Sequence, residues 1–303
     1  MNIKEYQNRI FANELTSGWI AGRAPMRIFL SLILLCLFHP GGANAAPRTV
    51  RLLTVGNSFA DNALTYLPQI VEAAGQKLIV ARANLGGCSL ERHWRHVAAH
   101  EADSASKEGS PYSKGKNSLA QLLAKEKWDF ITIQQVSIKS HDLSSYYPYV
   151  RDLHRYIKER APDAKIMAHQ IWAYHTISKE LGVEVVPSGD AMFLADSDSK
   201  WGYRPDTSFN FETAKPPALL RQSHSLHTGW SWRKEKDGTS KLRMDGHHAS
   251  KAGKYLLGCV WFEVFYGTSA VENTFVPEGL DSKYAKFLRL TAHQAVAGLK
   301  ADK

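Results

Sequence analysis

The stretch RTVRLLTVGNSFADN, residues 48–62, decides the fold class of this 303-residue chain. Residues 50–55, VRLLTV, are mostly apolar or β-branched, as expected of a strand that is buried on both faces of a parallel sheet. The run breaks off at Gly56-Asn57-Ser58, so a turn presents one small hydroxyl group at the end of the strand. A serine in that position predicts either the cap of a following helix or a nucleophile.

Strand patterns alternate with helix patterns along the rest of the chain. Further strands are expected at residues 77–87, 128–136, 164–172 and 183–189. Helices are expected at residues 63–76, 90–102, 119–127, 146–162, 190–198 and 283–299, with one more that begins at the cap Ser250. This alternation predicts the α/β class, a three-layer α/β/α, flavodoxin-like fold with a five-stranded, mainly parallel sheet.

Polar and glycine-rich groups follow four of the expected strands. In sheets of this kind, ligands bind beyond the carboxyl ends of the strands. Those ends carry Gly56-Asn57-Ser58, Gly86-Gly87, Gln134-Gln135 and His169-Gln170. The coincidence predicts a functional site at this edge of the sheet.

The N-terminal segment has the layout of a secretory signal peptide. Residues 28–38, IFLSLILLCLF, follow Arg27, and Ala43-Asn44-Ala45 fits a cleavage site. We therefore expect a start at Met26, an upstream extension at residues 1–25, and a mature secreted or periplasmic domain at residues 46–303. The apolar run is shorter than the ~20 residues of a membrane span, so no stable span is expected after cleavage, although an uncleaved anchor is the alternative.

Positive charge is concentrated in one part of the chain. The formal charge is +9, and +7 remains without residues 1–45. Residues 200–244 contribute nine basic and four acidic side chains together with Trp201, Trp230 and Trp232. We expect an irregular insertion there, either a lid or binding loop for an anionic polysaccharide or a solvated decoration. No nucleic-acid motif is present. Cys88 and Cys259 are expected to be two separate buried thiols, with a disulfide between them as the alternative in an oxidising compartment.

The segment RMDGHHASKAGKYL, residues 243–256, supplies the partners that a nucleophilic serine requires. Asp245 and His248 are three residues apart, which lets a carboxylate in a turn reach the imidazole Nδ1–H. His247 is a competitor for the same role. The simpler interpretation is an aspartate turn followed by two solvated histidines.

An ordered set of short blocks resembles the SGNH/GDSL hydrolase superfamily. The blocks are GNSF at 56–59, LGGCSL at 85–90, WDFITIQQVS at 128–137 and DGHH at 245–248. The chain is most similar to a branch of uncharacterised exported bacterial proteins that read GNSF where other members read GDS. The resemblance implies that Ser58 is the nucleophile, and that Asp245 and His248 complete a catalytic triad. It also implies that the N–H groups of Gly87 and Ser58 bind the oxyanion.

The third block departs from the pattern of that superfamily. Where other members have Gly-x-Asn, with an asparagine amide that donates to the oxyanion, this chain has Gln134-Gln135-Val136. A glutamine amide carries the same N–H₂ group on a longer arm. Gln135 is therefore the expected third donor, with Gln134 as the neighbouring candidate.

Further polar and aromatic side chains near the strand ends are expected to contact the substrate: Asn57, His93, Trp94, Gln134, His169 and Trp172. His93, His96 and His100 repeat along one helix face, but no carboxylate or cysteine pattern completes a metal site there. We expect neither a metal nor a cofactor.

The expected function is an exported serine esterase that removes O-acyl groups, chiefly acetyl, from carbohydrate. The carbohydrate part depends on export, on the tryptophans and on the basic insertion. A lipase or thioesterase would use the same triad with a pocket of aliphatic side chains. A catalytically inactive carbohydrate-binding protein would keep the tryptophans without needing the serine, and a metal-dependent hydrolase would lose activity to chelators.

Overall fold

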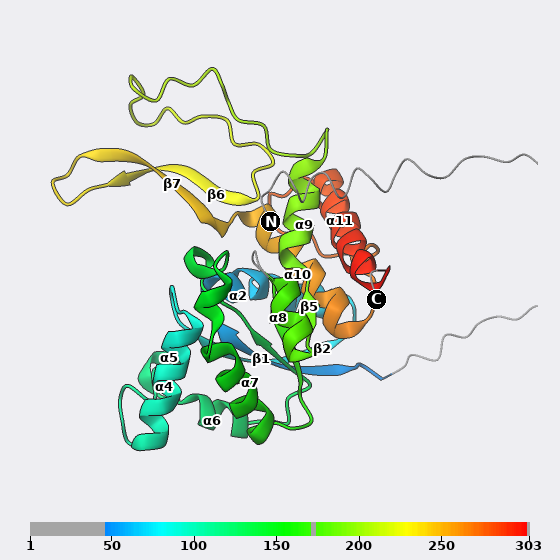
Figure 1. Cartoon of the computed structure of the whole chain (residues 1–303). Helices are drawn as coiled ribbons and strands as arrows, with labels where there is room; N and C mark the ends of the chain where they lie inside the picture. The colour runs from blue at the N-terminus through cyan, green and yellow to red at the C-terminus, as the bar shows by residue number, and fades with distance from the viewer. Residues whose placement is uncertain (1–45, 171–173, 302–303) are drawn as a thin grey trace, which may run out of the picture. The chain divides into compact units, whose positions relative to one another are not determined.

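Five parallel strands form a sheet in the order β2-β1-β3-β4-β5 (Figure 1). The computed structural model describes residues 46–170 and 174–301, and Ala46–Lys303 forms one compact unit. The strands are β1 (Thr49–Gly56), β2 (Lys77–Asn84), β3 (Phe130–Ile133), β4 (Lys165–His169) and β5 (Glu184–Val186). Because all of them run in one direction, their carboxyl ends meet at one edge of the sheet.

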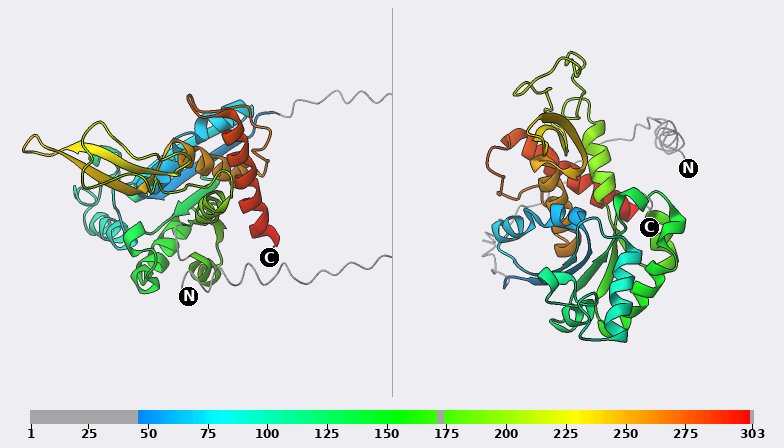
Figure 2. Two further views of the ribbon diagram at one scale, coloured as in Figure 1. Left: turned by 90° about the horizontal axis from the view of Figure 1, so that it is seen from above. Right: turned by 90° about the vertical axis from the view of Figure 1, so that its left-hand side faces the viewer.

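Helices cover both faces of this sheet (Figure 2). One layer contains α2 (Ser58–Leu64), α3 (Leu67–Ala73), α9 (Ser188–Ser197), α10 (Lys251–Tyr266) and α11 (Ser282–Ala301). The other contains α4 (Leu90–Ala102), α5 (Tyr112–Gly115), α6 (Leu119–Ala124), α7 (Tyr149–Arg160) and α8 (Tyr174–Leu181). Two short 3₁₀ turns, η1 (Ser137–Lys139) and η2 (Leu143–Tyr146), follow β3.

Strand β1 is buried on both faces, as its composition predicts. Val50 and Leu52 pack into the core under α2, α3 and α10, whereas Leu53 and Val55 pack into the core under α4, α6 and α7. The side chains of β1 enter both cores because successive side chains of a strand point to opposite faces of the sheet. The predicted three-layer α/β/α fold with a five-stranded sheet is confirmed.

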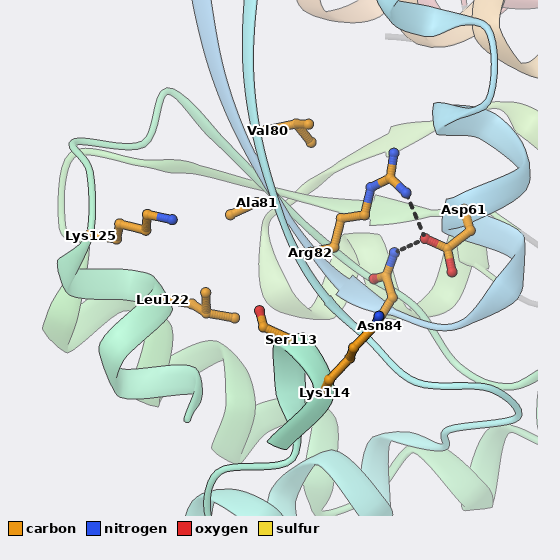
Figure 3. A pocket seen from close by; sticks show the side chains of 9 residues that line it. All are labelled: Asp61, Val80, Ala81, Arg82, Asn84, Ser113, Lys114, Leu122 and Lys125. Carbon is orange, nitrogen blue, oxygen red and sulfur yellow. Dashed lines mark hydrogen bonds and ion pairs between the residues drawn. The ribbon is translucent and has the colours of Figure 1, made fainter. Parts of the chain in front are cut away.

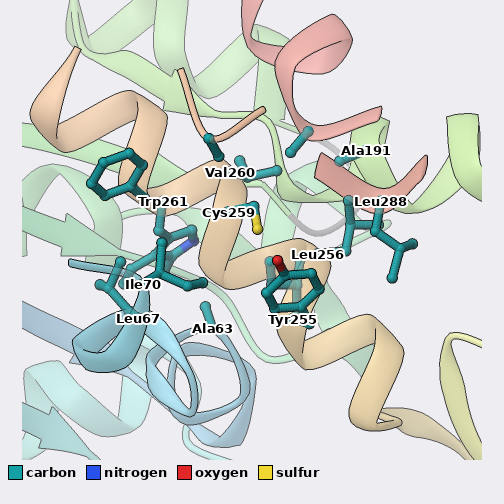
Figure 4. Close-up of a cluster of buried hydrophobic side chains, with 14 of the residues drawn as sticks. Ala63, Leu67, Ile70, Ala191, Tyr255, Leu256, Cys259, Val260, Trp261 and Leu288 are labelled. Atoms are coloured by element: carbon teal, nitrogen blue, oxygen red, sulfur yellow. The ribbon is translucent and has the colours of Figure 1, made fainter. Parts of the chain in front are cut away.

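Helix α10 is the centre of the larger core (Figure 4). It begins after the predicted cap, since the Ser250 hydroxyl accepts a hydrogen bond from the Gly253 N–H at 3.2 Å. Trp261 and Cys259 on this helix are fully buried. Cys259 and Cys88 are both free, buried thiols, which confirms the expectation that they do not pair.

The single helix expected at residues 63–76 is two helices. α2 already begins at Ser58 and ends at Leu64, and α3 starts at Leu67 with Pro68 in its first turn. Proline lacks the N–H that an interior helix position must donate, and it fits the first turn of a new helix. The break lets α2 start directly at the end of β1.

The insertion expected to be irregular at residues 200–244 is regular in its second half. There β6 (His227–Lys234) and β7 (Ser240–Ala249) form a two-stranded antiparallel sheet, drawn in yellow in Figure 1. Asp237-Gly238 makes the connecting turn, with Gly238 at φ +81°, and this hairpin signal was missed. Within the described residues, no helix combines the length and apolar character that crossing a membrane requires.

Candidate active site

Ser58 is the first residue of α2, immediately after the turn that ends β1. Asn57 is the cap of this helix, and its side-chain oxygen accepts a hydrogen bond from the Phe59 N–H at 3.1 Å. Gly56 is required because a Cβ there would lie 2.8 Å from the Gln134 side chain. Because Asn57 is the cap of α2, the Ser58 hydroxyl is left available for other contacts.

The structure brings Ser58, His248 and Asp245 together across 190 residues of sequence. His248 Nε2 lies 3.0 Å from Ser58 Oγ. His248 Nδ1 lies 2.9 Å from Asp245 Oδ2 and 3.2 Å from Oδ1. Both Asp245 and His248 are in β7, at its junction with α10, rather than in an isolated turn. This is the geometry of a serine nucleophile, a base and a carboxylate that orients the base.

The electrostatics of Asp245 suit the orienting role. Burial raises the pKa of this carboxyl, but hydrogen bonds from the His248 N–H and ring and from the His247 N–H outweigh it and lower the pKa to about 2. Arg233 Nη2 also lies 3.8 Å from Asp245 Oδ2. An ionised carboxylate can only accept hydrogen bonds, so His248 Nδ1–H donates to it and Nε2 is left to accept the Ser58 proton.

His247, the competitor, does not occupy the position of the base. Its backbone N–H donates to Asp245 Oδ1 at 3.1 Å, and its side chain lines a neighbouring pocket. His248 is the histidine that faces Ser58.

The loop after β2 lies beside the Ser58 turn. Leu85 N–H donates to Gly56 O at 3.1 Å, and the Asn57 amide donates to Cys88 O at 3.1 Å. Gly87 has φ +59°, and no atom approaches within 4 Å of its Cβ direction. In the described part of the chain, neither the Gly87 N–H nor the Ser58 N–H donates to a protein acceptor. Both predicted oxyanion donors are thus unengaged by the protein.

The prediction that Gln135 completes the oxyanion hole is wrong. Its amide nitrogen donates to Ser145 O at 2.9 Å, and its oxygen accepts from Leu90 N–H and Val136 N–H. This fully buried side chain ties the end of β3 to α4 and η2. Gln134 does not replace it, because its amide nitrogen donates to Asn57 Oδ1 at 2.7 Å.

Several residues expected to contact substrate instead hold the site from behind. Asn57, His93 and Gln134 are at most 2 % exposed, which contradicts their predicted contact with substrate. His93 bonds Gly56 O at 3.0 Å and the Tyr112 hydroxyl at 2.8 Å. The contacts of Asn57, His93 and Gln134 are those of buried polar groups, which must find partners within the fold. Trp94 is partly buried and packs edge-on against Tyr156, and its contact with substrate stays a prediction.

His169 bonds Gln134 Oε1 at 2.8 Å and is buried, yet it also lines the neighbouring pocket. Trp172, the last of the expected substrate contacts, lies outside the described residues.

Stability should fall in mild acid because of His93 and His169. Burial lowers the pKa of each from 6.5 to about 3, so between these values the unfolded chain binds protons that the folded protein does not. The stability that depends on these two neutral histidines is therefore fully present above pH 6.5. As the pH falls, the free energy of unfolding decreases by roughly 3 kcal/mol per pH unit near pH 5 for the two groups together. Urea unfolding at pH 7, 6 and 5 measures this slope. A His93→Gln variant should show about half of it, and a flat profile in the wild type would contradict the assignment.

A pocket of about 160 Å³ opens beside the triad. Its walls are mainly apolar and come from α2, α9, α10 and the ends of β4, β6 and β7; they include Phe59, Asn62, His169, Met192, Asp196 and Leu257. Phe59 directly follows Ser58, and its ring centroid lies 6.5 Å from that of His248. Sequence reasoning missed Phe59, Asn62 and Asp196, because single polar or aromatic positions on helices resemble ordinary surface or core residues.

A second, more open groove of about 570 Å³ lies along β2, α5 and α6 (Figure 3). Arg82, Lys114 and Lys125 line it, and Asp61 bonds Asn84 at 2.9 Å and pairs with Arg82 at 3.8 Å. None of the triad residues lines this groove.

The three tryptophans of the insertion are engaged in packing. Trp201 stacks on Tyr284 with 5.3 Å between the ring centroids, and Trp230 packs against Phe211 with 4.9 Å between theirs. Trp232 donates its indole N–H to Ala218 O at 2.7 Å. Each of these partly buried indoles therefore has a partner within the fold, and their contact with a sugar stays a prediction.

Comparison with known proteins gives a family but no activity. The family model described as "Domain of unknown function (DUF4886)" matches residues 51–204, which include Ser58 and the pocket residues of α9. The crystal structure of a DUF4886 family protein from Bacteroides uniformis, at 1.50 Å resolution, is 26% identical with a TM-score of 0.62, over 84% of this chain and 96% of that one. No curated protein matches. The chain belongs to the DUF4886 family.

Proposed function

We propose that this protein is an exported serine esterase of the SGNH/GDSL type that hydrolyses O-acyl esters. The observation that carries the proposal is the 3.0 Å contact between Ser58 Oγ and His248 Nε2, with Asp245 behind the same imidazole. The ordered sequence blocks support it as well. A serine that merely capped a helix would not need an oriented base.

The geometry suggests a two-step acyl transfer. His248 takes the Ser58 proton while Ser58 Oγ attacks the ester carbonyl, and the N–H groups of Ser58 and Gly87 stabilise the oxyanion. His248 then gives the proton to the leaving alcohol, and water repeats the sequence on the acyl-enzyme. Without Gln135 the hole has two donors, and a missing third donor typically costs about 3 kcal/mol of transition-state stabilisation. A modest turnover rate is the expected consequence.

One observation favours a second candidate, an acyl hydrolase of the lipase or thioesterase type. Phe59, Met192, Phe193 and Leu257 give the pocket beside Ser58 a largely hydrocarbon surface. That surface suits a substrate group larger and less polar than an acetyl, whereas O-deacetylation of carbohydrate depends on export, on the partly buried tryptophans and on surface charge.

Covalent labelling tests the reaction class. A fluorophosphonate should phosphonylate Ser58 Oγ, because only an activated serine displaces fluoride from phosphorus at a useful rate. Intact-mass analysis should show one added group, located by peptide mapping at residue 58, and chelators should not prevent it.

Matched variants complete this test. Ser199→Ala, at an exposed serine, should label as the wild type does, and Ser58→Ala should not label. Labelling at another residue, or none in a folded protein, would refute the proposal. Activity that chelators abolish would instead favour a metal-dependent hydrolase.

A further inference from the structure

Two residues that line the pocket beside the triad each have a buried polar atom that the protein leaves without a partner in the described residues. Asn62 is 7 % exposed, and its Nδ2 is buried without a hydrogen-bond partner in the described residues. Asp196 Oδ1 is also buried and has no hydrogen-bond partner in the described residues. Buried polar groups are nearly always paired, so two exceptions in one pocket require an explanation.

The surroundings of Asp196 disfavour a charged carboxylate that has no ligand beside it. It lies in the last turn of α9, where the helix dipole disfavours negative charge. Burial raises its pKa, which the nearby His227 and Arg204 only partly oppose. Unfavourable groups that a fold retains are concentrated at binding and catalytic sites.

The pocket lies next to Ser58 and His248, so Asn62 and Asp196 are near the ester bond that Ser58 would attack. Asn62 is one turn after Ser58 on α2, and Phe59 between them contacts the pocket and the His248 ring. His247 and Ala249, which flank His248, also line the pocket. A group attached to an ester carbonyl at Ser58 would enter this space.

We propose that this pocket binds a hydroxyl-bearing, otherwise hydrocarbon-like part of the ester substrate, with Asn62 donating to and Asp196 accepting from its hydroxyl groups. Asn62 supplies N–H donors and an ionised Asp196 only acceptors, and a hydroxyl group satisfies both. The walls of Phe59, Met192 and Leu257 match the carbon skeleton. The inference rests on the proposed ester hydrolysis. The hydroxyl belongs either to a hydroxyacyl chain or to a ring alcohol, and these share the same chemistry.

Two matched substrate pairs separate these sources. For the acyl side, kcat/KM is compared for p-nitrophenyl 3-hydroxybutyrate and p-nitrophenyl butyrate. For the alcohol side, it is compared for a methyl glucopyranoside acetylated on one ring hydroxyl and for cyclohexyl acetate. Sites built to bond a hydroxyl reject analogues that lack it, so a preference of at least tenfold is expected in one pair.

Variants assign the preference to these residues. Asn62→Leu and Asp196→Leu should each reduce it about tenfold, and Asp196→Asn, which keeps an acceptor oxygen, should retain part of it. Asp163→Leu, an exposed carboxylate outside the pocket, should leave the ratio unchanged. Asn62→Leu should also raise Tm, because it removes a buried amide without a partner.

The outcomes are distinguishable. Hydrolysis that depends on Ser58 but shows no preference in either pair would overturn this inference and leave the esterase proposal standing. A lower Tm for Asn62→Leu with an unchanged ratio would assign Asn62 a structural role and overturn it as well. Hydrolysis that persists in Ser58→Ala would overturn the proposed function and this inference with it.

Discussion

Ser58→Ala is expected to lower kcat/KM for p-nitrophenyl acetate by about 10⁴-fold or more. Without the hydroxyl, His248 has no proton to remove and no acyl-enzyme can form, so water must attack the ester directly. The residual rate would come from the oxyanion donors and from substrate binding. Steady-state release of p-nitrophenolate measures the effect.

The loss should be in kcat rather than KM, because the hydroxyl acts in the transition state. Far-UV circular dichroism and thermal unfolding of the variant exclude misfolding as its cause. A folded Ser58→Ala protein that keeps activity within tenfold of the wild type would show that another residue is the nucleophile.

His248→Ala is expected to cost about as much as Ser58→Ala, since members of a triad act as a unit. The neighbouring His247 provides the matched control. Its ring does not bond Ser58, although it lines the pocket, so His247→Ala should change kcat/KM by less than about tenfold. The two adjacent variants are compared on the same substrate at the same pH.

The double variant Ser58→Ala/His248→Ala completes the comparison. It should be no slower than either single variant, because the remaining group has nothing to act on. Losses that multiply in the double variant, or equal losses at His247 and His248, would contradict the assignment of the base.

The layer architecture was predictable because it follows from local periodicity. Residues 50–55 read as a strand buried on both faces, and Val50 and Leu53 do pack into opposite cores. Ser250 also reads correctly as a helix cap. The hairpin of β6 and β7 was not predicted, because its strands are rich in charged and polar residues and do not share one apolar alternation.

The candidate site was predictable only in part. Ser58, Asp245 and His248 lie in recognisable blocks, and their short local spacing limits what each can do. Gln135 and His93 are as polar as any catalytic residue, but both point into the fold and are consumed by buried hydrogen bonds. Residue type and position along a strand do not say which neighbour an amide or imidazole will meet.

By itself, the sequence determined the alternation of strands and helices in the main sheet and the residues proposed to perform acyl transfer, since both are properties of short segments. Tertiary structure alone decided that the imidazole of His248 meets the hydroxyl of Ser58 across 190 residues. It also decided that Asn62 and Asp196 share one pocket with unsatisfied polar atoms. Hydrogen bonds act over about 3 Å, and only the packing of α2, α9 and β7 against one another brings such distant groups within that range.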